Sequence, residues 1–412
     1  MFELDPAFIK PTYNSHCFTA VPQSIAGLLG HGQVILAPEL FRGLPKTYRS
    51  VVLILLDGFG WRFFEKVVEA YPALRRFAAA DGVAKLTAQF PSTTAAHITC
   101  LHTGLEVGQS GVYEWQYYEP QLDAIITPLL FSYAGTKERD QLKATGIDPR
   151  RLYPTSTLYQ QLAKHGIVSV VLQHREYTPS TFSDIVFNGA KVFGYHTLPE
   201  VLVNLRLLLA EQREPTYYML YFDRMDALCH EYGPNAPQVE AELVAFLTTL
   251  EREFLARVSG DGEVLVLLTA DHGQSETHPR RTVYLNTDPS FTGFERFLRA
   301  DRQGKPIVPA GSARDFFLYI RDELLEEAHN FLARRLVGRA VVYRTADLIA
   351  EGFFGAAPVS EVFLGRVGNL VVLPYRGEAV WWYEQGRFEQ NYLGHHGGLT
   401  PQEMEIPLLA LF

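Results

Sequence analysis

Val51-Val-Leu-Ile-Leu-Leu56 is an uninterrupted apolar run that ends at Asp57-Gly58. A run of this length without polar alternation predicts a strand that is buried on both faces, as strands of a parallel sheet are. Residues 217–222 and 264–269 have the same character and predict two further strands of this kind. Acidic residues follow each of the three runs closely, so we expect their side chains at the carboxyl ends of strands.

Apolar residues recur at helical spacing between the predicted strands. Alternation of strands and helices predicts an α/β fold with a doubly wound, mostly parallel central sheet and helices on both faces. Functional loops in such a sheet lie at the carboxyl ends of its strands. Helices are expected over residues 61–80, 95–103, 157–165, 198–211 and 239–258, and shorter strands over 83–86 and 167–172.

The pattern changes after about residue 280. Residues 316–320, 341–343 and 369–373 predict strands and residues 323–336 a helix, which together indicate an inserted α+β subdomain. Residues 404–412 are apolar again and are expected to return to the main sheet. We therefore expect an N-terminal arm packed on the core (1–48), a catalytic α/β core (49–280 and 391–412) and an inserted cap subdomain (281–390).

Composition restricts the kinds of partner. The chain has 412 residues, 47% of them hydrophobic, and a formal net charge of −9. This is enough apolar sequence for a large core, and an acidic chain without a Lys/Arg run is a poor candidate for binding duplex nucleic acid or an anionic membrane. Small anionic substrates remain compatible, because a helix N-terminus or a metal ion reverses the field locally.

The cysteines and the N-terminal sequence predict a cytoplasmic protein. Cys17, Cys100 and Cys229 are far apart, odd in number and form no CxxC, which favours reduced thiols over a disulfide framework or a thiolate zinc site. No basic segment followed by an apolar run opens the sequence, so we expect no signal peptide. The apolar runs are too short to span a bilayer.

Ligand-type side chains gather at two strand ends. Asp57 follows the first apolar run, although an Asp before Gly is also a common turn residue. Asp271 and His272 follow the strand expected at 264–269, where charge is costly unless it is paired or bound. We interpret these three residues as candidate metal ligands.

A helix and a turn supply further candidates. Asp226 and His230 are four residues apart, so on a helix both project from one face and could share a metal; the alternative is an exposed ion pair. His395-His396 precedes two glycines and reads as either a ligand turn or a polar loop. Oxygen and nitrogen ligands without thiolates suit zinc, or manganese as the alternative, and their number suits two ions.

Two metal ions about 4 Å apart can clamp a phosphoryl group, but such a site still needs a nucleophile. Phe90-Pro-Ser-Thr-Thr-Ala-Ala-His97 places Thr94 at an expected helix N-terminus, where backbone N–H groups favour anionic oxygen. The alternative is that Thr93 or Thr94 merely caps the helix.

Five stretches carry a resemblance to a known family. The sequence resembles the type I phosphodiesterase/nucleotide pyrophosphatase family of the alkaline phosphatase superfamily, and all five stretches occur in that family's order. They are LILLDGFG (53–60), FPSTTAAHITCLHTG (90–104), YFDRMDALCHEYGP (221–234), LLTADHGQ (267–274) and HHGGLTPQEMEIPL (395–408).

The resemblance implies roles for individual residues. Thr94 would be the nucleophile that becomes phosphorylated. His97 stands where many members have an Asn that holds a phosphoryl oxygen, so either His97 takes over as donor or backbone N–H groups suffice; otherwise it is a helix-surface histidine. One ion would lie among Asp57, Thr94, Asp271 and His272, and the other among Asp226, His230 and His396.

We therefore predict a metal-dependent phosphoryl-transfer hydrolase, a two-metal phosphodiesterase/nucleotide pyrophosphatase. Its substrate is expected to be a small phosphate ester, with a nucleotide as one candidate. Tyr113 and Trp115 are candidates for stacking on a base, or alternatively core aromatics. A phosphomonoesterase or phosphonate hydrolase on the same site is the related alternative. A non-catalytic metal-bound scaffold is the alternative of another class, and the complete set of ligand types counts against it. The oligomeric state stays open.

Overall fold

The computed structural model describes residues 2–41, 47–258 and 262–412. Residues 1 and 42–46 of the predicted arm, and 259–261 of the predicted core, lie outside the described residues. The described part of the arm packs on the main core: Phe18 and Leu36 are fully buried in it, and the Phe18 N–H donates to the Thr87 carbonyl.

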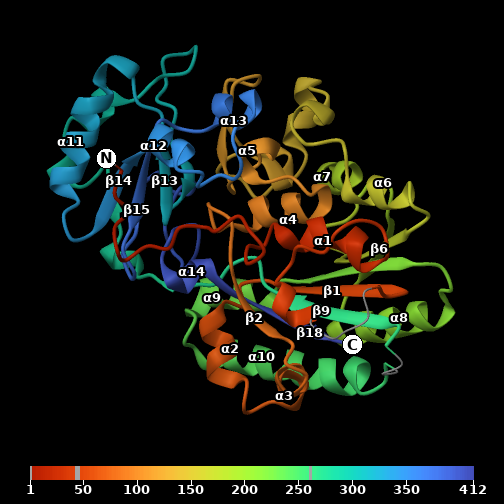
Figure 1. Cartoon of the computed structure of the whole chain (residues 1–412). Helices are drawn as coiled ribbons and strands as arrows, with labels where there is room; N and C mark the ends of the chain where they lie inside the picture. The colour runs from red at the N-terminus through yellow and green to blue at the C-terminus, as the bar shows by residue number, and fades with distance from the viewer. Residues whose placement is uncertain (1, 42–46, 259–261) are drawn as a thin grey trace.

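A seven-stranded sheet forms the centre of the molecule, with the strand order β2-β18-β9-β1-β8-β6-β7 (Figure 1). β1, β6, β7, β8 and β9 are parallel, whereas β18 runs antiparallel between β9 and β2. The predicted doubly wound, mostly parallel α/β sheet is confirmed. The strands are β1 (Ser50–Leu56), β2 (Val83–Thr87), β6 (Val168–His174), β7 (Lys191–Tyr195), β8 (Thr216–Phe222), β9 (Val264–Thr269) and β18 (Glu405–Leu411).

The strand register determines where the site lies. Leu55 pairs with Tyr221 of β8 and with Thr269 of β9, so the three strands end at the same level. Every residue of β1 is buried, which agrees with its unbroken apolar sequence. The acidic segments that follow these strands therefore meet at one edge of the sheet.

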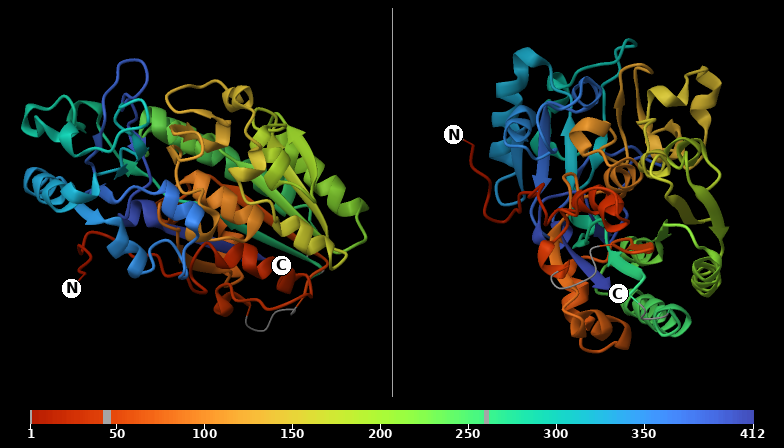
Figure 2. Two further views of the ribbon diagram at one scale, coloured as in Figure 1. Left: turned by 90° about the horizontal axis from the view of Figure 1, so that it is seen from above. Right: turned by 45° about the vertical axis from the view of Figure 1, so that its right-hand side comes forward.

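Helices cover both faces of the sheet, as Figures 1 and 2 show. The helix predicted at 61–80 is two helices, because Tyr71 precedes a proline and takes an extended conformation. One group comprises α1 (Ala20–Leu28), α4 (Thr94–Thr103), α6 (Leu158–Ala163) and α7 (Thr181–Val186). The other comprises α2 (Trp61–Val67), α3 (Pro72–Ala79), α8 (Leu198–Glu211) and α10 (Pro237–Leu250), the last continuing as a π-helix over Glu251–Leu255.

A second, antiparallel sheet lies in the region of the predicted insert, with the order β12-β13-β15-β14. Its hydrophobic cluster includes Phe316, Phe331 and Val372, whereas Phe353 and Phe363 belong to the main core. The region thus shares a core with the sheet, and boundaries at 281 and 390 stay a prediction. The elements are β12 (Ala310–Ser312), β13 (Asp315–Leu318), β14 (Ala340–Arg344), β15 (Leu370–Pro374), α11 (Leu325–Arg335), α12 (Thr345–Ala350) and α13 (Glu361–Arg366).

Short elements complete the fold. Several are too short for a repeating pattern of apolar residues to predict them. A 3-10 turn spans Gln141–Thr145. The other short strands are β3 (Tyr117–Glu119), β4 (Ala124–Thr127), β5 (Ser132–Tyr133), β10 (Ser275–Glu276), β11 (Val283–Tyr284), β16 (Val380–Trp381) and β17 (Gly394–His395). The remaining α-helices are α5 (Val107–Ser110), α9 (Arg224–Tyr232) and α14 (Pro401–Met404).

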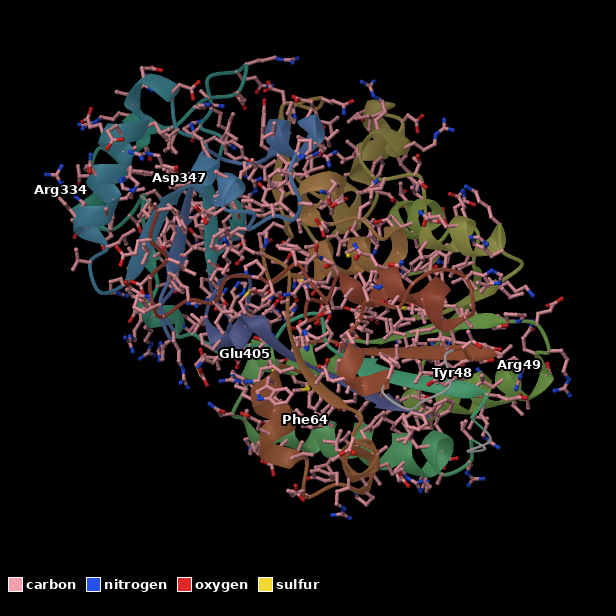
Figure 3. All side chains as sticks on the ribbon, viewed as in Figure 1. Tyr48, Arg49, Phe64, Arg334, Asp347 and Glu405 are labelled. Carbon is pink, nitrogen blue, oxygen red and sulfur yellow. The ribbon has the colours of Figure 1, made fainter. Side chains whose placement is uncertain are left out.

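A buried ion pair joins the second sheet to the segment before β18. Arg314 Nε and Nη2 donate to the two carboxylate oxygens of Glu403 at 2.9 and 2.8 Å, and both side chains are fully buried. Glu403 also accepts the N–H of Gly398. Figure 3 shows Arg49, which precedes β1, and Glu405, which begins β18, at opposite ends of the sheet. Glu403 lies just before Glu405, so the Arg314–Glu403 pair lies toward the carboxyl edge of β1.

We expect Arg314→Met to lower the free energy of unfolding by about 3–5 kcal/mol, because it leaves the Glu403 carboxylate buried without its counter-charge. Urea unfolding followed by circular dichroism measures the change. Lys66→Met is the control, since Lys66 and Glu240 form an ion pair whose side chains are more than half exposed; it should change the value by less than about 1 kcal/mol. Equal unfolding midpoints for the two variants would contradict the role of the buried pair.

Candidate functional site

Two buried carboxylates and one partly buried carboxylate meet at the carboxyl edge of the sheet. Asp57 directly follows β1, Asp271 follows β9 after one residue, and Asp226 lies in the first turn of α9, which begins just beyond β8. Asp57 is 2% exposed and Asp271 fully buried. The predicted i,i+4 geometry of Asp226 and His230 is present, since both lie in α9.

One group of ligand-type atoms surrounds His272. Its Nε2 lies 3.4 Å from Asp57 Oδ1, 3.3 Å from Asp271 Oδ2 and 3.1 Å from Thr94 Oγ1. The structure thus brings together the four residues proposed for one metal ion.

A second group consists of Asp226, His230 and His396. His230 Nε2 is 3.2 Å and His396 Nε2 3.8 Å from the Asp226 carboxylate, and one ligand atom from each residue lies within 4.8 Å of the others. The two groups are adjacent, because the rings of His272 and His396 stack with centroids 3.6 Å apart. One ligand atom from each of Asp57, Asp226 and His272 also lies within 4.8 Å of the other two.

Backbone carbonyls orient all three histidines. The Nδ1 atoms of His230, His272 and His396 lie 2.8, 3.0 and 3.0 Å from the carbonyl oxygens of Gly394, Gly273 and Ser92. A carbonyl oxygen can only accept, so each Nδ1 carries the hydrogen and each Nε2 presents a lone pair to the cluster. Metal-binding histidines are held in this way.

The carboxylates also fit metal cations. Asp57 Oδ1 and Asp271 Oδ2 are buried and have no hydrogen-bond partner among the described residues. Such atoms are costly unless something compensates them. Burial, followed by the negative charges of Asp271 and Asp226, raises the pKa of Asp57 well above its usual value. A bound cation would remove this repulsion, so the residues present suit a divalent metal.

The pKa of Asp226 is shifted in the opposite direction. Burial alone would raise its pKa, but His230, His396 and His272 outweigh that effect and lower it. Correspondingly, burial would lower the pKa of His230, but Asp226 and the Gly394 carbonyl raise it.

The two threonines of the motif face different ways. Thr93 Oγ1 donates to the Tyr113 carbonyl at 3.0 Å and makes no helix-capping bond. Thr94, the first residue of α4, directs its hydroxyl toward His272. The geometry therefore favours Thr94 over Thr93 as the reactive group, and neither side chain is a cap.

The contacts of His97 do not support the proposed oxyanion role. Its Nδ1 donates to the Thr93 carbonyl at 2.7 Å, and its Nε2 accepts the Gln89 N–H at 2.8 Å. Burial lowers the pKa of His97 to about 3, so the ring is neutral and has no second N–H. It is also not on the helix surface, being fully buried. His97 instead holds the turn before α4 against the helix.

A cavity of about 820 Å³ opens onto both groups. Trp115, 47% exposed, lies in its wall, whereas Tyr113 is a core residue that packs against Tyr117 and Phe317. Of the two predicted stacking residues, only Trp115 is therefore available. The cavity is lined by Asp57, Thr94, Asp226, His230, His395 and His396 at one side and by Ile98, Leu129, Arg139, Gln173, Phe182, Trp381 and Asn391 elsewhere.

Sequence reasoning missed two side chains that hold the carboxylates. The Tyr221 hydroxyl donates to Asp57 Oδ2, and Gln274 Nε2 donates to Asp226 Oδ1. Gln274 stands three residues after Asp271 in the LLTADHGQ stretch, which was a usable signal. Tyr221 opens the YFDRMDALCHEYGP stretch, but as one aromatic residue of an apolar strand it gave no indication of a hydrogen bond to Asp57.

Comparisons with known proteins identify the family and the fold of the chain. The type I phosphodiesterase/nucleotide pyrophosphatase family matches residues 51–399. Murine ectonucleotide pyrophosphatase/phosphodiesterase 5, solved as an inactive variant with AMP, shares 17% identity over 87% of both chains, with a TM-score of 0.60. Phosphonoacetate hydrolase from Sinorhizobium meliloti, solved with phosphonoacetate, shares 16% identity over 88% of this chain and 90% of its own, with a TM-score of 0.61.

These structural similarities show a common fold. The search of curated proteins found no match. Within the described ranges, no helix is long and apolar enough to cross a membrane. Because the family match covers most of the chain, the protein belongs to the type I phosphodiesterase/nucleotide pyrophosphatase family.

Proposed function

We propose that this chain is a metal-dependent phosphodiesterase or nucleotide pyrophosphatase in which Thr94 is the nucleophile. The observation that carries the proposal is the position of the Thr94 hydroxyl. It lies at the N-terminus of the ten-residue helix α4, in the cavity wall, 3.1 Å from His272 and beside two groups of metal-ligand atoms.

The donor set suits two divalent cations, with zinc as our first choice and manganese as the alternative, because it offers carboxylates and imidazoles without thiolates. Asp57, Thr94, Asp271 and His272 would hold one, and Asp226, His230 and His396 the other. When bound, such ions supply Lewis-acid chemistry that lowers a hydroxyl pKa and offsets charge on phosphoryl oxygens.

The residues of the chain would then carry out two displacements. Thr94 Oγ forms a bond to phosphorus while the bond to the leaving oxygen breaks, which gives a phosphothreonine and a released alcohol or phosphate. Water then attacks that phosphorus and frees Thr94. The N–H groups of Thr94, Ala95 and Ala96 lie in the first turn of α4, where helices leave such donors unpaired, and they favour anionic oxygen there. Backbone donors thus take the role first considered for His97.

The cavity suggests a substrate larger than a simple phosphate monoester. Its volume of about 820 Å³ exceeds what a phosphoryl group needs, and apolar residues such as Ile98, Leu129 and Phe182 line much of it. The murine structure holds AMP and the hydrolase structure holds phosphonoacetate, so related folds take a nucleotide as well as a small phosphonate. We favour a diester or nucleotide pyrophosphate, with monoester or phosphonate hydrolysis as the alternative.

Thr94→Ala should lower turnover of a chromogenic phosphodiester by about 10³-fold or more, because no other group takes over the attack. Metal content, measured by elemental analysis, should fall little, since three other side chains remain in that group. Thr93→Ala is the matched control and should stay within about tenfold of the original turnover. Retained turnover in Thr94→Ala would remove Thr94 as the nucleophile.

Dialysis against a chelator should abolish turnover, and added zinc should restore it. Bound metal should also raise the melting temperature, because it binds only the folded chain. Asp226→Asn should lose part of the metal and of this thermal shift. Asp223→Asn, a nearby aspartate outside both groups, should keep its full metal content. Full turnover after complete metal removal would contradict the proposal.

The substrate class can be tested by comparing bis(4-nitrophenyl) phosphate, 4-nitrophenyl phosphate and phosphonoacetate. We expect the diester to give the highest kcat/KM. Trp115→Ala should raise KM for a nucleotide diester about tenfold, as the loss of one base-stacking contact does. A preference for the monoester or phosphonoacetate would instead support the alternative, and metal binding without any turnover would support a scaffold.

A further inference from the structure

His395 lies beside the second ligand group without belonging to it. It is the last residue of β17, paired with Ser275 of β10, and it lines the cavity. Its ring centroid is 5.3 Å from that of His230 and 5.7 Å from that of His396. The chain thus places a further imidazole in the cavity wall, beside the second ligand group.

The backbone orients His395 in the opposite sense to the three ligand histidines. The N–H of His396 donates to His395 Nδ1 at 2.9 Å. An amide N–H can only donate, so from this shorter contact we assign Nδ1 of the neutral ring as the acceptor and place the hydrogen on Nε2. The His396 carbonyl oxygen also lies 3.1 Å from Nδ1, but this contact is longer.

The Nε2–H of His395 is free for a ligand. In the parts of the chain that the structure describes, no hydrogen bond involves His395 Nε2. This atom is also not one of the buried side-chain atoms that lack a partner, so it is accessible. We therefore infer that His395 Nε2 faces the cavity that this residue lines. An N–H in this position cannot bind a metal, but it can donate to an anionic oxygen.

We propose that His395 is a catalytic residue whose Nε2–H donates a hydrogen bond to an oxygen of the phosphoryl group being transferred. The inference rests on the proposed phosphoryl-transfer function. It adds a side-chain donor to the backbone N–H groups of α4, since backbone groups engage both ring nitrogens of His97. A fixed donor aimed at developing negative charge contributes more to the transition state than to the bound substrate.

Two substitutions distinguish the effect of the His395 N–H donor from the effect of its ring. His395→Phe keeps a flat ring of similar size without an N–H, and His395→Gln keeps an N–H donor at similar reach. In the metal-loaded chain, we expect His395→Phe to lower kcat/KM for bis(4-nitrophenyl) phosphate by about 10²-fold. It should also weaken binding of inorganic phosphate, measured by calorimetry, by about tenfold. His395→Gln should recover at least about tenfold of kcat/KM, and metal content should be unchanged in both.

His165→Gln is the control, because His165 is exposed, stacks on His31 and does not line the cavity. It should leave kcat/KM and phosphate affinity unchanged. Unchanged kcat/KM and phosphate affinity in His395→Phe would overturn the proposal, and so would loss of metal from both variants, which would make His395 a ligand or a purely structural residue. If the original chain hydrolyses no ester, the proposed function fails, and the phosphate affinities alone decide whether His395 is a donor.

Discussion

Repulsion among three carboxylates that the fold forces together is the constraint on which the site depends. Asp57, Asp226 and Asp271 meet because β1, β8 and β9 are parallel and end at the same level. Two of their oxygens have no hydrogen-bond partner among the described residues, so the arrangement is incomplete as protein alone. Histidines from distant segments face the same point, each fixed by a backbone carbonyl. A divalent cation is the simplest partner for such a set.

The segment that carries His396 is held from the second sheet. Ser312 Oγ donates to the His396 carbonyl, and Arg314 binds Glu403, which in turn accepts the Gly398 N–H. Gly397 has a φ of +127°, and a Cβ there would lie 2.5 Å from Asp315 Oδ1, so only glycine fits the turn. The region predicted as an insert thus helps to position His396, a proposed metal ligand, and is not merely a cover over the cavity.

The sequence predicted what depends on local pattern. β1 follows from apolar continuity, the segment with Asp226 and His230 has the helical form that their shared face requires, and the choice of Thr94 over Thr93 agrees with the geometry. Pro72 marks the break between α2 and α3 in the sequence itself. The contacts of His97 could not be predicted, because its partners are backbone groups brought close by tertiary packing. The tautomer of His395 depends on one backbone N–H, which no side-chain pattern can indicate.

β18 has a consequence for biosynthesis. It lies between β9 and β2 and pairs with both, although it is built from residues 405–411. Until these residues leave the ribosome, the edges of β2 and β9 that face each other lack the strand that pairs with both. An edge that lacks its partner is open to wrong strand pairing. Because β18 follows the His396 segment closely, we expect closure of the sheet and placement of His396 beside Asp226 to depend on the same stretch of chain.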